Sequence, residues 1–576
     1  MTYLMVIGER VAVLEGYRSI RCDVGSLFVA EGVAFAPCGH HGVVIGDSQA
    51  PPVEDASETA TPISWENSNE IRIRAGMTGR NAVFYATYKN AIYISDDPSL
   101  IAVLVSAPIN TTEVAVRLSS ASGRYPFSGG VMWQGVHMVS PGMWLIVRQG
   151  VIGFERWWQP PTKELDFKEA VYQVRQGLKQ GVSDSLESSR QMAVDISGKP
   201  ESTVVAYTLA EQHNGFKVIT VIDDGTTTED ITWARRAVSD MICEHHLLNM
   251  FGHSPIYEPG YWRRLPEGPS EADVYLPAIA KLDATVVKEQ PTMYLTGIGG
   301  AELFGQVTPL PWSLVRDKAV RGLFQAVQVA DSNKITKSRM LRLIFQGGSP
   351  SDDLLTSARS RLVGVDTQNN LDARWVPLVG LPAFASETAG ELLRDELKRH
   401  AQTEDLALDK DRSRHHIYAS VLRQGTVVRR LNRMSSSPNR LEVRSPYLER
   451  RVIEPALALR AENRMNGQLI EPVLAESRPR LMPAQFFLPA EQKLPVEPYW
   501  NPQERVAHWF SQGSVLADMG LIDLDQIMAV ASTKNLHPKK WEELQRAYRM
   551  ELWLRSYNEG QSQHRSSEGS QIRLTK

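Results

Sequence analysis

The stretch Ser197–Thr203 (SGKPEST) decides the fold, because a short glycine turn here joins a strand to a helix. The preceding Met192–Ile196 (MAVDI) has the apolar character of a buried strand, and the chain is helical from Ser202. Ligands of open α/β sheets bind where strands end and helices begin. Free backbone N–H groups and the helix dipole favour an anion at such a place. The groups available to it are the backbone at Gly198, the hydroxyls of Ser197, Ser202 and Thr203, and the cation of Lys199.

The loop is not a Walker A motif, because G-x-x-x-x-G-K-[ST] needs an earlier glycine where Ala193 stands. Taken alone, the turn is equally consistent with a serine-capped connection that binds nothing. Other motifs in the chain are needed to distinguish an anion-binding loop from a serine-capped turn.

Three regions of different pattern surround the loop. Short segments rich in β-branched and aromatic residues, such as AVFYATY and AIYIS, predict a β-rich domain over residues 1–165. Strands and helices then alternate, which favours a parallel sheet. In this part we expect helices over residues 202–213 and 231–249 and a strand at TMYLT. The pattern is mostly helical from about residue 310, so the second domain spans residues 166–558, and residues 559–576 form a disordered tail.

Composition narrows the functional class. A net charge of -3 gives no general attraction to nucleic acid or an anionic membrane. Three widely spaced cysteines do not make a disulfide framework, and no segment has the pattern of a signal peptide or a membrane span. We therefore expect a cytoplasmic protein without nucleic-acid or membrane partners.

Three motifs in order resemble one known family. SGKPEST resembles the PP-loop S-G-G-x-D-S of ATP pyrophosphatases, with Lys199 and Glu201 at the positions of the second Gly and the Asp. Thr296–Phe304 (TGIGGAELF) resembles the S/T-G-D-G-x-D-E-L-F segment of asparagine synthetases, and Glu442–Glu449 (EVRSPYLE) resembles their E-x-R-x-P-F/Y-L-D. The chain is thus similar to the asparagine synthetase-like family, and most closely to lasso-peptide macrolactam cyclases.

The resemblance implies a fold and a site. The fold is a degenerate Ntn-glutaminase-like sandwich, then a doubly wound PP-loop α/β synthetase domain with a helical C-terminal extension. The implied cofactors are ATP and Mg²⁺, with Glu201 as the metal ligand. Catalysis is assigned to Glu442 and Arg444, and to a lysine whose position holds Ala490 or Lys493, depending on the alignment; Lys493 is the candidate. The implied ATP and pyrophosphate site comprises Ile196, Ser197, Gly198, Lys199, Glu201, Ser202, Thr203, Val221, Gly297 and Gly299.

The resemblance also implies which amine reacts. A working glutaminase needs Cys directly after the initiator Met, whereas this chain has Thr2. An enzyme that uses the amine of its own substrate is therefore favoured: a lasso cyclase that activates an Asp or Glu side chain for attack by the N-terminal amine of a leader-free precursor peptide. A leader peptidase and a leader-binding protein would be further partners.

Two alternatives stay open. Ile298 and Ala301 replace the two aspartates of the second motif, which favours a catalytically impaired homologue that binds peptide or regulates an active cyclase paralogue. An asparagine synthetase or a β-lactam synthetase-like enzyme is the other alternative.

Overall fold

The computed structural model describes residues 3–8, 16–20, 25–31, 33–37, 42–46, 60–66, 70–189, 191–222, 226–250, 267–270, 291–332, 336–364, 373–434, 441–464, 471–488, 503–533 and 536–566. None of the helices in these ranges combines the length and the apolar character that crossing a bilayer requires.

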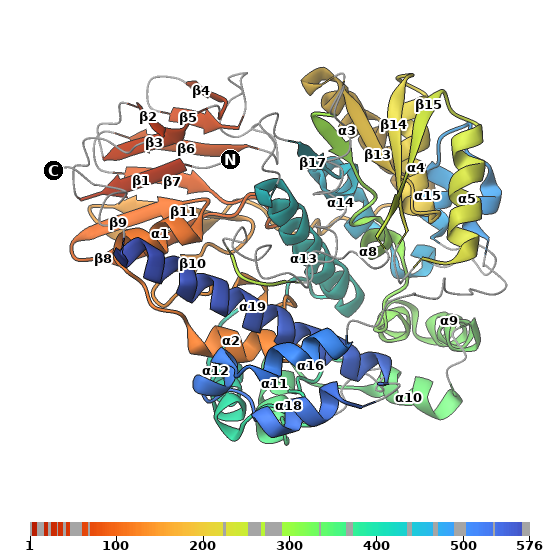
Figure 1. Cartoon of the computed structure of the whole chain (residues 1–576). Coiled ribbons are helices and arrows are strands. Elements are labelled where there is room, and N and C mark those ends of the chain that lie inside the picture. The colour runs from red at the N-terminus through yellow and green to blue at the C-terminus, as the bar shows by residue number, and fades with distance from the viewer. Residues whose placement is uncertain are drawn as a thin grey trace.

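Two six-stranded antiparallel sheets form the N-terminal part (Figure 1). Their strands are β1 (Tyr3–Ile7), β2 (Tyr17–Ile20), β3 (Ser26–Ala30), β4 (Phe35–Pro37), β5 (Gly42–Ile45), β6 (Thr61–Glu66), β7 (Glu70–Arg74), β8 (Phe84–Tyr88), β9 (Ala91–Ser95), β10 (His137–Met138), β11 (Met143–Arg148) and β12 (Val151–Arg156). The orders are β10-β8-β9-β1-β3-β2 and β12-β11-β7-β6-β5-β4. We call these two sheets the sandwich.

The sandwich is buried on two sides, as the alternation along β1 shows. Tyr3 and Met5 belong to the core between the two sheets. Leu4 and Val6 point the other way, into a core shared with the helices α1 (Pro98–Val105) and α2 (Thr111–Leu118). The sandwich therefore packs against the rest of the molecule through an apolar face.

A five-stranded parallel sheet with the order β15-β14-β13-β16-β17 follows (Figure 1). The chain moves outward from β13 to β15 and returns on the other side of β13 to β16. This reversal places the loops after β13 and β16 side by side, at the kind of crevice where open α/β sheets bind ligands. The elements are α3 (Phe167–Ser188), β13 (Met192–Asp195), α4 (Pro200–Ala210), β14 (Phe216–Ile222), α5 (Thr228–Ser239), β15 (Cys243–Asn249), β16 (Met293–Leu295), α8 (Gly300–Phe304), β17 (Glu442–Arg444), α14 (Arg450–Ala458) and α15 (Pro472–Ser477).

The helix predicted over residues 231–249 is wrong in its second half. The helix α5 ends at Ser239, and Cys243–Asn249 is a strand whose seven residues all pair in register with β14. The local sequence CEHHLLN has no strong strand preference. Pairing with the main chain of β14 decides its conformation, as is usual for strands.

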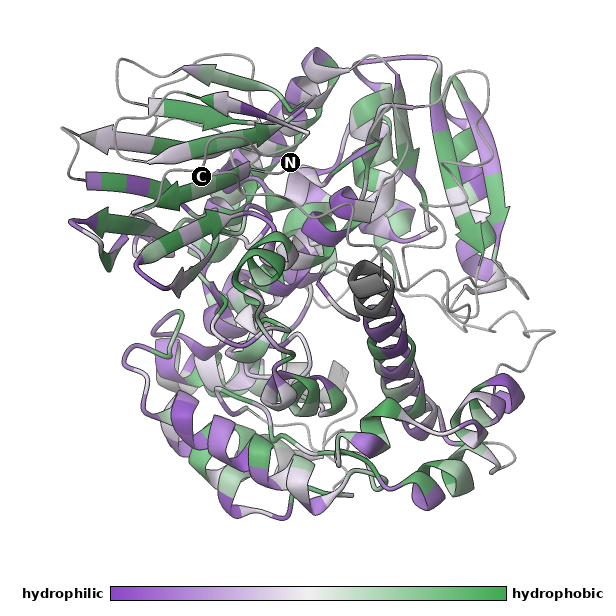
Figure 2. Ribbon diagram, turned by 60° about the vertical axis from the view of Figure 1, so that its left-hand side comes forward, coloured by the Kyte–Doolittle hydropathy of each residue, from purple (hydrophilic) through white to green (hydrophobic). Residues whose placement is uncertain are grey.

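The remaining described residues are mainly helical. The helices are α9 (Leu310–Ser332), α10 (Lys337–Phe345), α11 (Pro350–Arg359), α12 (Glu387–Ala401), α13 (Arg412–Met434), α16 (Gln503–Ser511), α17 (Val515–Asp518), α18 (Leu524–Ala531) and α19 (Pro538–Ser566), with short 3-10 turns at Phe127–Gly129, Pro446–Leu448, Ala461–Arg464 and Ala484–Phe487. The predicted tail therefore begins too early, because residues 559–566 continue α19. Adding residues to an existing helix needs no new nucleation, which explains the extension. Figure 2 shows the strands rich in hydrophobic residues, whereas several helices alternate between polar and apolar faces.

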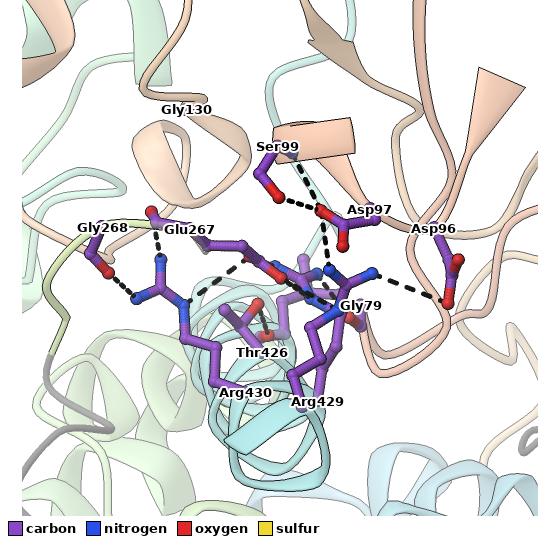
Figure 3. A network of polar contacts seen from close by, with 12 residues as sticks. Gly79, Asp96, Asp97, Ser99, Gly130, Glu267, Gly268, Thr426, Arg429 and Arg430 are labelled. Carbon is purple, nitrogen blue, oxygen red and sulfur yellow. Dashed lines mark hydrogen bonds and ion pairs between the residues drawn. The ribbon is translucent and has the colours of Figure 1, made fainter. Parts of the chain in front are cut away.

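The helix α13 lies in the middle of the molecule, between the sandwich and the part that holds the parallel sheet (Figure 1). At its start, the fully buried guanidinium of Arg412 lies over the rings of Trp312 and Trp375, 4.4 and 5.1 Å from their centroids. At its other end, buried arginines meet the carboxylates of the sandwich and of Glu267 (Figure 3). Arg429 donates to Glu267 across 2.6 Å and to the Gly79 carbonyl across 2.9 Å.

Glu267 and its arginines form a closed ionic network. Arg433 pairs with Asp97 at 3.2 Å and with Asp96 at 3.6 Å, and Arg430 donates to the Gly268 carbonyl across 2.7 Å. Burial alone would raise the pKa of Glu267, but the surrounding arginines outweigh it and lower that pKa to about 2. The network thus joins three separate stretches of chain through charges withdrawn from water.

Candidate functional site: the phosphate loop

The loop after β13 is held by its own hydroxyl groups. Ser202 Oγ accepts the Ser197 N–H across 3.0 Å, and the Thr203 hydroxyl donates to the Lys199 carbonyl across 2.7 Å. Pro200 occupies the first turn of α4, where a missing N–H costs nothing. Lys199 is the N-cap, its side chain is exposed, and no side chain caps this helix. The uncapped N-terminus is therefore available to an anion.

Gly198 allows a close approach that no other residue would. Its φ is 84°, and a Cβ placed there would lie 2.1 Å from the Asp230 carbonyl oxygen. Asp230 in turn forms a capping box with Thr227 at the start of α5. The loop therefore lies between the N-termini of α4 and α5.

The second motif lies directly against the first. A Cβ on Gly297 would come within 2.6 Å of the Ser202 nitrogen, and Gly299 has a φ of 95°. Asp195, the last residue of β13, accepts the Gly297 N–H across 3.1 Å and the Thr296 hydroxyl across 3.3 Å. Ser197–Thr203, Gly297 and Gly299 are thus brought together as the sequence predicts.

Asp195 belongs to this site although none of the three sequence motifs includes it. Burial raises its pKa to about 7, in spite of the hydrogen bonds from Gly297 and Thr296. Its position directly before the loop is a signal that could have identified it. The other two predicted strand residues lie nearby: the Ile196 N–H donates to the Ile219 carbonyl across 2.9 Å, and Val221 follows two residues later on β14.

The third motif reaches the loops through residues other than the predicted ones. The Ser445 hydroxyl donates to the Ile298 carbonyl across 2.5 Å, and the Tyr447 hydroxyl donates to the Glu201 carbonyl across 2.9 Å. Glu442 instead pairs in register with Met293, at the opposite end of the strand from these contacts. With about 3.3 Å per residue, that offset is roughly 10 Å along the sheet.

Glu442 and Arg444 form a pair of their own. Their side chains meet at 2.6 Å, and Arg80 of the sandwich, itself buried, lies 3.7 Å from Glu442 and 3.4 Å from Glu449. Burial would raise the pKa of Glu442, but Arg444 and Arg80 hold it below its usual range. Glu442 is therefore an ionised carboxylate at the boundary with the sandwich. The third predicted catalytic residue, Lys493, lies outside the described residues.

A cavity of about 230 Å³ opens beside Glu442, between the sandwich and β17. Its walls carry both charges, from Arg80, Asp96 and Arg433, and apolar groups from Val33 and Ala82. This space is large enough for an amino-acid residue, because one water needs only about 15 Å³ of such volume.

A second feature missed from the sequence is Glu471, which precedes α15. Its side chain is buried, and its Oε2 meets no hydrogen-bond donor in the described part of the chain. Burial, with Glu201 and Glu302 nearby, raises its pKa well above the ordinary value. The described residues contain no group of three or more His, Cys, Asp or Glu side chains arranged for a metal ion. A nucleotide-bound Mg²⁺ needs only one or two protein carboxylates, so an orphaned carboxylate oxygen beside Glu201 fits that ion.

Together, these observations define an α/β domain with a phosphate-type loop at the carboxyl edge of its parallel sheet. The asparagine synthase family model matches residues 173–555, more than half of the 576 residues. The chain therefore belongs to the asparagine synthase family and, at the level of that family, is an ATP-dependent carbon–nitrogen ligase. A comparison with curated proteins gave no match.

Solved structures with a distant likeness include two enzymes. Glutamine phosphoribosylpyrophosphate amidotransferase from B. subtilis, complexed with ADP and GMP, is 10% identical, covering 43% of this chain and 81% of that chain with a TM-score of 0.19. NMN synthetase from Francisella tularensis is 12% identical, covering 42% of this chain and 95% of that chain with a TM-score of 0.18.

Proposed function

We propose that this protein is an AMP- and pyrophosphate-forming lasso-peptide macrolactam cyclase. A side-chain carboxylate of a leader-free peptide attacks the α-phosphorus of ATP, and pyrophosphate leaves. The N-terminal amine of the same peptide then attacks the acyl-adenylate, releasing AMP and a proton and closing an isopeptide ring. A leader peptidase and a leader-binding protein are the partners that would supply such a peptide.

The observation that carries this proposal is the cavity beside Glu442. It has room for a peptide residue, and its walls offer charges of both signs, from Arg80, Arg429 and Arg433 and from Asp96 and Glu442, to the amine and the carboxylate of a peptide. Thr2 stands where a glutaminase of this family needs cysteine, which favours an amine that arrives with the substrate.

The residues of the chain would act mainly by positioning and by charge. The N-terminus of α4, with Gly198 and the hydroxyls of Ser197 and Thr203, would hold the phosphates. Mg²⁺, held by Glu201, would neutralise phosphate charge when bound. Arg80 and Arg444 keep Glu442 ionised, so that it can orient the incoming amine.

The test uses the full-length protein with MgATP and the core peptide of the precursor. We expect pyrophosphate release and a product lighter by one water, with both followed in the same reaction by a coupled assay and mass spectrometry. Acetylation of the peptide N-terminus should abolish the ring but leave peptide-dependent exchange of pyrophosphate into ATP. Replacing the acceptor Asp or Glu of the peptide by its amide should abolish both.

Two results would contradict the proposal. One is glutamine-dependent or ammonia-dependent formation of asparagine from aspartate, which would make the protein an asparagine synthetase. The other is ring formation from a free amino-acid derivative, which would indicate a β-lactam synthetase-like enzyme.

Ile298 and Ala301 favour a second candidate, an impaired homologue that binds peptide without turnover. Ile298 is partly buried and Ala301 is exposed, and neither side chain can ligate a cation. An impaired homologue would bind the core peptide yet release no pyrophosphate, and Ile298→Asp would raise its rate from zero. A competent cyclase turns over without that change.

A further inference from the structure

The backbone and the carboxyl group of Glu471 are both in unusual states. Its φ is 54°, in the left-handed region that residues other than Gly, Asn and Asp rarely adopt. The residue is only 6% exposed, and its Oε2 has no hydrogen-bond donor among the described residues. Such strain and an unsatisfied buried oxygen at one residue are features that cluster at ligand sites.

Glu471 points at the phosphate loop. Its carboxyl group neighbours that of Glu201 and lies against the end of α8, where a Cβ on Gly305 would be 3.7 Å from Glu471 Oε1. Glu201 stands in the first turn of α4, and its side chain crosses the start of α8, where a Cβ on Gly300 would lie 2.7 Å from Glu201 Cβ. A third carboxyl group nearby, that of Glu302, accepts a hydrogen bond from the Gln424 side chain across 2.6 Å.

The pair therefore combines two hard oxygen donors beside an anion-binding loop, and among the described residues no cationic side chain pairs with Glu471. Two carboxylates this close repel one another when both are ionised, and a divalent cation between them removes the repulsion. Phosphate oxygens and water would fill the other positions of an octahedral Mg²⁺ ion.

We propose that Glu471 replaces the carboxylates missing at Ile298 and Ala301, and that Glu471 and Glu201 together bind the Mg²⁺ of the bound nucleotide. The inference rests on the proposed function, because it needs a nucleotide at the phosphate loop. It explains why Glu201 is one methylene longer than the Asp of the family motif: the second ligand comes from the residue that precedes α15, not from the loop after β16.

The experiment measures metal binding without turnover. Full-length protein is titrated with Mn²⁺ in the presence of α,β-methylene-ATP, and free Mn²⁺ is followed by electron paramagnetic resonance, with protein-free nucleotide as the blank. Nucleotide binding is measured separately in EDTA. We expect Glu471→Gln to weaken Mn²⁺ binding in the ternary complex at least tenfold and to leave metal-free nucleotide binding unchanged or tighter. Glu476→Gln, an exposed residue of the same helix, is the matched control and should change neither.

A compensating variant guards against loss of folding. Ile298→Asp in the Glu471→Gln background should recover Mn²⁺ affinity by returning a carboxylate to the second loop, and Glu471→Asp serves if Glu471→Gln does not fold. Unchanged Mn²⁺ affinity in Glu471→Gln would overturn the inference while leaving the proposed function intact. Failure of the wild-type protein to bind the nucleotide, with or without metal, would overturn the proposed function as well.

Discussion

The carboxylate of Asp195 accepts the backbone N–H of Gly297 across 3.1 Å, so the end of β13 holds the loop that follows β16. This bond joins the first and second motifs, which are about a hundred residues apart in the chain. It also places a buried carboxyl group beneath the loop that we assign to the phosphates. Any negative charge on Asp195 would oppose a bound phosphate, so its protonation and nucleotide binding are linked.

Asp195→Asn tests that linkage through stability. The pKa of Asp195 in the folded protein is about 7, above its value in the unfolded chain. The contribution of this carboxyl group to the free energy of unfolding is therefore fully present below about pH 4 and is lost as the pH rises towards 7. Asn keeps an acceptor for Gly297 and does not titrate. The free energy of unfolding of the variant, relative to that of the wild type, should therefore rise by up to about 1.4 kcal/mol per pH unit between about pH 4 and 7. Urea unfolding at about pH 5 and about pH 8 measures the difference. An equal difference at both pH values would show that Asp195 is ionised throughout.

Gly198→Ala should disable the phosphate loop. The new Cβ would meet the Asp230 carbonyl at 2.1 Å, and the φ of 84° is strained for alanine. We expect ATP affinity to fall more than tenfold, about 1.4 kcal/mol or more, by calorimetric titration. Gly215→Ala is the matched control, because Gly215 has a φ of 76° but no atom within 4 Å of its Cβ position. Equal losses in both variants would trace the effect to backbone strain alone.

His415 should make the fold sensitive to acid. Burial lowers the pKa of His415 to about 3, while its Nδ1 accepts the Leu408 N–H across 3.0 Å. Because the folded pKa is below the unfolded value of about 6.5, stability falls as the pH drops below that value. His415→Gln should cost about 1 kcal/mol at neutral pH and reduce the dependence between about pH 7 and 5. His508→Gln, at an exposed position, should leave that dependence unchanged.

Arg429→Met should destabilise the protein by disrupting the ionic network of Glu267 and the arginines at the end of α13. It removes the 2.6 Å pair with the buried Glu267 carboxylate, and breaking such a pair costs about 3 kcal/mol. Adding Glu267→Gln should restore part of the loss, because it removes the buried carboxylate that lost its closest partner, while Arg433 keeps its pairs with Asp97 and Asp96. Arg450→Met removes an exposed pair with Glu454 and should change the free energy of unfolding by less than about 1 kcal/mol. If the exposed and buried variants behaved alike, the network would contribute little.

The local patterns predicted the parts of this fold that local forces determine. The strand Met192–Asp195, the glycine loop and the helix α4 are all where the sequence places them. Their signals lie within one or two turns of chain. Cys243–Asn249 was mistaken for helix because its strand pairing comes from β14 and not from its own residues.

The candidate site was predictable only in part, for the same physical reason. The motif spacing indicated that Gly297 and Ser202 approach each other, and they do. Nothing near Glu471 in the sequence shows that its carboxyl group lies beside Glu201, because the contact depends on the packing of α15 against α8. The strand register, which places Glu442 away from the loop, is likewise a property of the assembled sheet.

The continuous helix α13 sets a limit on how this protein can be divided. An excised fragment beginning near residue 166 would present the arginines at the end of α13 to solvent without Asp96 and Asp97, and the apolar face of the sandwich would be lost with them. The sandwich thus stabilises the rest of the molecule, whether or not it has a reaction of its own. That dependence is a structural reason for the chain to retain its N-terminal region, independent of any reaction there.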